Sequence, residues 1–100
     1  MISCDGDRCT LQGAVHSGNV VTVLDEGKLL FVAPHVTVDL GGLTEVDSTA
    51  ISLLLEWRRA AQRDNRKITY INLSKNLKSL AELYGVTELL GETREDRRET

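Results

Sequence analysis

The stretch Val36–Asn65 constrains the fold most, because its apolar spacing changes from that of a strand to that of a helix. It opens with alternating apolar and polar residues, the period-two pattern of a half-buried strand, and the apolar ones are Val36, Val38 and Leu40. The pair Gly41-Gly42 is expected to end that strand. From Ala50 onward the apolar residues recur at helical spacing. The stretch therefore predicts a strand, a short loop and a helix.

The predicted loop-to-helix junction carries Asp47, Ser48 and Thr49. Asp47 and Ser48 are both good N-caps, because a short side-chain oxygen can accept the unpaired amides of the first helical turn. A phosphate on Ser48 would also be stabilised there, since a helix N-terminus carries a partial positive charge. Spacing alone favours the capping role for Ser48 and leaves a phosphorylation or partner site as the alternative.

Two apolar strips run along this predicted helix, at about 100° per residue. The wider strip is the predicted core face, formed by Ala50, Leu53, Leu54, Trp57 and Ala61. Ile51 and Leu55 are expected to lie outside it, on the solvent side. The hydroxyl pair Ser48 and Ser52 and the guanidinium of Arg59 lie beside them. Exposed apolar residues next to a hydroxyl-bearing helix start predict a protein-binding surface, whose candidate residues are Asp47, Ser48, Thr49, Ile51, Ser52, Leu55 and Arg59.

The N-terminal residues predict a β-hairpin. Ile2–Cys4 and Arg8–Val15 are expected to be two strands joined by a tight turn at Gly6. Cys4 and Cys9 would face each other across this hairpin, at a separation where a disulfide is conceivable. We nevertheless expect two free thiols, because we expect a cytoplasmic protein. Their spacing matches neither a redox CxxC pair nor a zinc site.

Periodicity leaves the stretch Asn19–Val32 open between strand and helix. Its apolar residues fit a helical face, but Gly27 weakens a helix by roughly 1 kcal/mol. We expect a helix here, because a parallel strand that begins near Val36 needs a crossover connection before it.

The C-terminal part predicts one more strand and one more helix. Lys67–Leu73 is expected to be a strand, and Ser74 can cap a helix over Lys75–Tyr84 that ends at Gly85. The helical spacing in that segment is that of Leu77, Leu80, Ala81 and Tyr84. Residues 1–90 are thus predicted to form one domain, and the charged segment 91–100 is expected to be a disordered tail.

Composition excludes several classes of function. A net charge of −3 gives no electrostatic basis for binding nucleic acid. No apolar run approaches the roughly 20 residues of a membrane span, and the N-terminus lacks the layout of a secretory signal. We therefore expect a cytoplasmic protein without direct membrane insertion. The sequence contains no phosphate-binding loop, dinucleotide motif or zinc-protease motif, which predicts a non-catalytic binding module with no cofactor and no metal.

Two segments together resemble STAS domains. Val46–Ser48 is similar to the D-S-S-G-like junction of anti-anti-sigma factors, whose first serine is phosphorylated by a partner kinase, although Thr49-Ala50 replace Ser-Gly here. Leu80–Tyr84 is closer to MlaB-type STAS domains, the STAS subunits of phospholipid ABC transporters. In those subunits the corresponding junction holds a functionally important threonine.

The resemblance covers roughly residues 2–90 and implies an α/β fold, a single STAS domain with a mixed β-sheet flanked by α-helices. It also implies a helix within Asn19–Val32. In function it implies a subunit that binds the ATPase subunit of an ABC transporter for phospholipid trafficking. Such a subunit would meet the inner-membrane permease only indirectly and lie peripheral to that membrane. Two alternatives stay open: an anti-anti-sigma factor regulated by phosphorylation of Ser48, and a small nucleotide-binding protein.

Overall fold

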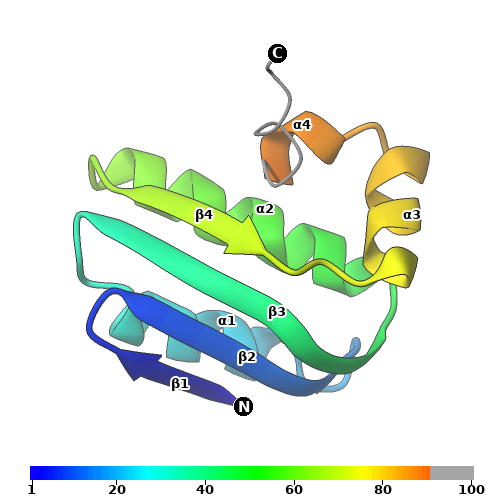
Figure 1. The fold of residues 1–100 in the computed structure, drawn as a ribbon, viewed down its shortest axis with the longest axis horizontal. Helices are drawn as coiled ribbons and strands as arrows, with labels where there is room; N and C mark the ends of the chain where they lie inside the picture. The colour runs from blue at the N-terminus through cyan, green and yellow to red at the C-terminus, as the bar shows by residue number, and fades with distance from the viewer. Residues whose placement is uncertain (91–100) are drawn as a thin grey trace.

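The computed structural model describes residues 1–90, in which helices pack against one face of a four-stranded sheet (Figure 1). In chain order the strands are β1 (Ile2–Asp5), β2 (Arg8–Val15), β3 (His35–Val46) and β4 (Lys67–Ile71). The helices are α1 (Val20–Leu30), α2 (Ser48–Arg63), α3 (Lys75–Leu83) and α4 (Thr87–Leu90). The segment 91–100, expected to be a disordered tail, lies outside the described residues.

The sheet is mixed, as predicted, and its strands follow the order β1-β2-β3-β4. β1 pairs with β2 in antiparallel fashion, whereas β2 with β3 and β3 with β4 are parallel pairs. Each parallel pair needs a crossover connection, and α1 and α2 provide the two crossovers. Both helices lie behind the sheet in the view of Figure 1 and pack against each other. The helix expected within Asn19–Val32 is therefore confirmed.

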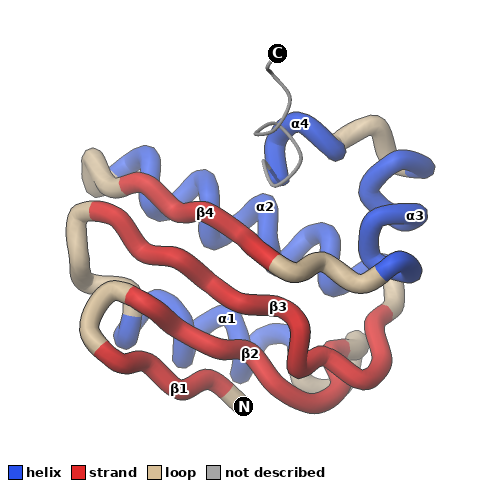
Figure 2. The backbone as a smooth tube through the Cα atoms, viewed as in Figure 1, coloured by secondary structure: helices blue, strands red, loops and turns tan. Residues whose placement is uncertain are grey.

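β3 confirms the predicted alternation but contradicts its predicted end. Val36, Val38 and Leu40 are buried on the face that the helices cover. The strand does not stop at Gly41-Gly42 but continues to Val46 (Figure 2). β3 continues because β2 stays paired with it beyond the two glycines, through shifts in the register. A Cβ atom on Gly42 would lie 2.8 Å from the Gln12 side chain, so glycine is what allows this close approach.

Trp57 anchors α2 to α1 in the core. Its Nε1 donates a hydrogen bond to the Leu24 carbonyl of α1 at 3.0 Å, which satisfies the polar end of a buried ring. Its ring meets that of Phe31 edge to face, with centroids 4.9 Å apart. A Cβ atom on Gly27 would lie 2.4 Å from the Trp57 ring. Glycine occurs inside α1 because the indole occupies the space that a side chain would need.

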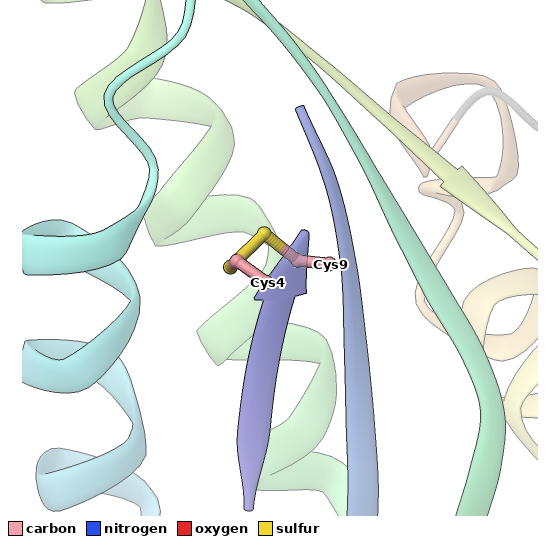
Figure 3. Close-up of a disulfide and its surroundings, with 2 residues drawn as sticks. All are labelled: Cys4 and Cys9. Carbon is pink, nitrogen blue, oxygen red and sulfur yellow. A yellow bond between two sulfur atoms is a disulfide. The ribbon is translucent and has the colours of Figure 1, made fainter. Parts of the chain in front are cut away.

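The N-terminal hairpin is present, and its two cysteines form a disulfide (Figure 3). The expectation of two free thiols is therefore wrong. Cys4 and Cys9 are direct partners in the β1–β2 register, and their Cα atoms are 4.0 Å apart. The pairing of the strands brings the two sulfurs together without any movement of the backbone.

The C-terminal elements pack largely as predicted. Ser74 caps α3, because its Oγ accepts the Leu77 N–H at 3.1 Å. β4 ends at Ile71, earlier than predicted, because Asn72 adopts a φ of 60° that a strand does not allow. Leu90 is buried in the core. Among residues 1–90, no helix has the length and apolar character needed to cross a bilayer.

Candidate functional site

Asp47 is the N-cap of α2 and holds the junction in place. Its Oδ1 accepts the Thr49 N–H at 2.9 Å and also the Thr49 hydroxyl. Ser48 is the first residue of the helix, so the capping role favoured for it is wrong. Asp47 caps because it keeps the extended backbone of a cap position, with φ −120° and ψ −170°, from which a side chain can reach back to the next amides.

The Asp47 carboxylate is kept ionised at this position. The hydroxyl and the amide of Thr49 lower the pKa of Asp47, and the backbone amide of Ser17 and the charge of His16 act in the same direction. Burial raises the pKa, by less than either Thr49 hydrogen bond lowers it. The first amides of α2 thus already face a negative charge, and a phosphate on the adjacent Ser48 would have to share them with it.

Four of the predicted residues form one line along the exposed side of α2. Ser48, Ser52, Leu55 and Arg59 follow each other at intervals of four, three and four residues, which places them on a single face of the helix. The two serines and Arg59 are exposed, and Leu55 is half-buried. Arg59 forms an ion pair with Glu56 one turn earlier. We call this line the α2 strip.

Ile51 does not belong to the α2 strip, and its predicted exposure is wrong. Its side chain is only 3% exposed and belongs to the hydrophobic core. The core face of α2 is broader than the sequence suggests, because α1, α3 and α4 contact α2 in addition to the sheet. Helices and sheet together bury more of the surface of α2 than the sheet alone would.

The end of α3 exposes two apolar residues that the sequence reasoning did not assign to a surface. Leu77 and Ala81 are buried, in agreement with the helical spacing of this segment. Tyr84 shares that spacing but is 52% exposed, and its neighbour Leu83 is 75% exposed. A signal was available, since Leu83 falls outside the predicted apolar face of the helix. This pair is a second exposed apolar feature of the domain, on α3 rather than on α2.

The two histidines have local structural partners. His16 Nδ1 accepts the Gly18 N–H at 3.0 Å in the turn before α1. His35 Nε2 lies 2.9 Å from the hydroxyl of Thr69 on the neighbouring strand. Within residues 1–90, no three side chains of His, Cys, Asp or Glu are grouped so that they could hold a metal ion.

Comparisons with known proteins agree with this arrangement. A family model described as "Mlab, STAS domain" matches residues 4–91. No curated protein matches the sequence. The solved structure of the anti-sigma factor antagonist SpoIIAA in its unphosphorylated form is similar with a TM-score of 0.72 and 14% identity, over 96% of this chain and 89% of that one.

Two structures of Mglu are also similar, one of them in its native form. They give TM-scores of 0.59 and 0.51 at 24% and 21% identity and cover 75% and 69% of this chain. The chain spans only 20% and 22% of their length. At these identities, the likeness to SpoIIAA and to Mglu concerns the fold.

Proposed function

Because the chain belongs to the MlaB-type STAS domain family, we propose that it is a non-catalytic subunit that binds the ATPase subunit of an ABC transporter for phospholipid trafficking. Through that partner it would lie at the cytoplasmic side of the inner membrane and meet the permease indirectly. The observation that carries this proposal is the α2 strip, in which two exposed serines and an exposed arginine flank the half-buried Leu55 on a helix whose other face is packed in the core.

The α2 strip has the chemistry of a modest protein interface. A half-buried Leu55 lies between polar residues, which corresponds to a small apolar centre with a polar rim. Within residues 1–90, the hydroxyls of Ser48 and Ser52 have no hydrogen-bond partner, so both are available to another chain. Trp57 and Tyr70 hold the opposite face of the helix, since the Tyr70 hydroxyl donates to the Leu54 carbonyl at 2.7 Å. A rigid helix loses little conformational entropy on binding.

An anti-anti-sigma factor switched by phosphorylation is the second candidate. Its support is the exposed hydroxyl of Ser48, which a kinase could reach, together with a fold shared with SpoIIAA. The Asp47 beside it does not separate the two candidates, because the junction that resembles anti-anti-sigma factors also has an aspartate directly before its phosphorylated serine. The third reading, a small nucleotide-binding protein, stays a prediction that calorimetric titration of ATP into the pure chain tests.

Co-purification from the native cell tests the proposal. The tagged chain is purified, and its partners are identified by mass spectrometry. An ABC transporter ATPase among them supports the proposed function, whereas an anti-sigma kinase supports the second candidate. A Ser52→Asp chain serves as the interface variant, since it adds a charge at the centre of the α2 strip. A Thr22→Ala chain, changed at an exposed position of α1, serves as its control and should retain the partner.

A further inference from the structure

A cavity of about 150 Å³ opens between the ends of α1 and α2 and the start of β4. Its inner wall is apolar, formed by the buried Phe31, Val36 and Trp57 together with the half-buried Ile68. It lies at the opposite end of α2 from Ser48, so it is separate from the junction described above. The cavity is therefore a second feature of the molecule that requires its own explanation.

Cationic side chains surround the mouth of this cavity. They are Lys28, Arg63, Arg66 and Lys67, with Asp64 as the one acid among the lining residues. Arg66 is engaged, because it donates to the Phe31 carbonyl at 2.9 Å and lies 3.8 Å from the Asp64 carboxylate. None of the ion pairs within residues 1–90 involves the other three cations. A chain with a net charge of −3 thus gathers unpaired positive charge at one apolar opening.

The helix ends alone do not account for these cations. Cations are favourable near helix C-termini, where free carbonyls carry partial negative charge. Here the final carbonyls of α2 already have backbone donors, since Asp64 N–H donates to Ala60 at 3.2 Å and Arg66 N–H to Ala61 at 2.8 Å. Lys67 begins a strand and belongs to no helix end. Lys28 and Arg63 lie in the last turns of α1 and α2. Together with Lys67, they take part in no ion pair within residues 1–90, so these three cations are available to an external anion.

We propose that this cavity binds a small aryl anion, with the ring inside and a carboxylate or phosphate at the cationic mouth. A cavity of about this volume holds a group of about the size of benzene. Phe31 and Trp57 already meet edge to face, and an aromatic guest can extend such a contact. At the mouth, lysine and arginine offer charge-assisted hydrogen bonds to either head group. This proposal does not depend on the proposed transporter function.

Fluorescence titration of the full chain tests the proposal, because Trp57 is the only tryptophan and lines the cavity. Benzoate and phenyl phosphate are the two anionic probes, and benzyl alcohol is the neutral one. We expect saturable binding of at least one anion with a Kd of about 1 mM or tighter. Benzyl alcohol should bind at least about tenfold more weakly, as expected for the loss of a charge-assisted contact. The stronger of the two anions identifies the preferred head group.

Matched variants separate this site from general effects. Lys67→Gln removes one cation from the mouth and should weaken anion binding about tenfold. Lys75→Gln makes the same change at an exposed position of α3 away from the cavity and should leave the Kd unchanged. Ala61→Leu places a larger side chain in the lining and should abolish binding while the circular dichroism spectrum stays native.

Three results would overturn the proposal. One is the absence of saturable binding for both anions at about 10 mM, tenfold above the expected Kd. Another is equal affinity for benzyl alcohol and the anions, which would show that the cationic mouth plays no part. The third is an Ala61→Leu chain that folds and binds with the original Kd, which would place the bound probe elsewhere.

Discussion

Asp47 and Ser48 are neighbours in the chain but have different environments. The carboxylate of Asp47 is engaged by the amide and the hydroxyl of Thr49, whereas the Ser48 hydroxyl faces solvent. Both residue types are common at helix starts, so composition could not assign the cap. Backbone conformation decides it, because only Asp47 precedes the helix.

Asp47 should make the stability of the domain depend on acid pH. Its pKa is lowered by Thr49, so the ionised form stabilises the fold above about pH 4, and this contribution is lost as the pH falls through the lowered value. Asp47→Asn keeps an equally good cap without the charge. The difference in Tm between the original chain and the Asp47→Asn chain should therefore shrink from pH 6 to pH 3. Asp39, whose pKa is also lowered, by the Gly41 amide and then Asn72, is present in both chains and cancels.

Ser48→Asp should leave the domain folded but prevent capture of the ATPase. An exposed substitution changes stability by less than about 0.5 kcal/mol, and an acid in the first helical turn suits the helix dipole. At a partner interface, the same carboxylate would be buried without a counter-charge. Melting curves and co-purification are the two measurements. Ser48→Ala is the control, since it adds no charge, and a Ser48→Asp chain that captures the ATPase normally would place Ser48 outside the interface.

At the scale of the element, α1 shows how packing overrides a weak helix former. Gly27→Ala would add about 1 kcal/mol of helix propensity. The new Cβ would lie 2.4 Å from the Trp57 ring, however. Overpacking of this kind costs about 1–3 kcal/mol, which should exceed the gain in helix propensity. We expect a lower urea midpoint than that of the original chain. Thr22→Ala, at an exposed position of α1, should hardly move the midpoint, and a stabilised Gly27→Ala chain would contradict this packing.

Adjacent positions on α2 should respond in opposite ways to a charge. Ile51→Asp places an unpaired carboxylate in the core, which should cost at least about 3 kcal/mol and strongly lower the urea midpoint. Ser52→Asp places the same group in solvent and should keep the native circular dichroism spectrum. If Ser52→Asp unfolds and Ile51→Asp does not, the orientation of α2 is wrong.

These elements show which parts of the fold local pattern can predict. The alternation in β3 and the Ser74 cap were predicted because each depends on neighbours within a few residues. The continuation of β3 past Gly42 depends on β2, and the burial of Ile51 depends on helices elsewhere in the chain. The four residues of the α2 strip were among the predicted surface residues, whereas Ile51 was wrongly added to them and the cationic cavity was not predicted at all. Its lining comes from α1, β3, α2 and β4, which only the folded topology brings together.

At the scale of the whole molecule, the disulfide should add stability without being essential to the fold. It closes a short loop, with a sequence separation of 5, so chain entropy gives it about 2 kcal/mol at most. A domain of ordinary stability, about 5–15 kcal/mol, survives that loss. Reduction should lower the urea midpoint by about 1–2 M. Cys4→Ser should show the lower midpoint with or without reductant, and a reduced chain that is unfolded in water would contradict this estimate. Folding without the bridge is compatible with the proposed cytoplasmic location.

The order of the strands has a consequence for the kind of recognition that this molecule can perform. In many α/β sheets the order reverses, neighbouring helices leave on opposite faces, and a crevice opens at the carboxyl ends of the strands. Here the order follows the chain from β1 to β4, and α1 and α2 lie on one face. The hollow beside the start of α2 is instead formed by the ends of β2 and β3, the Asp47 junction and Asn76 of α3. A partner at that end would therefore contact an exposed helix start together with an open hollow in the surface.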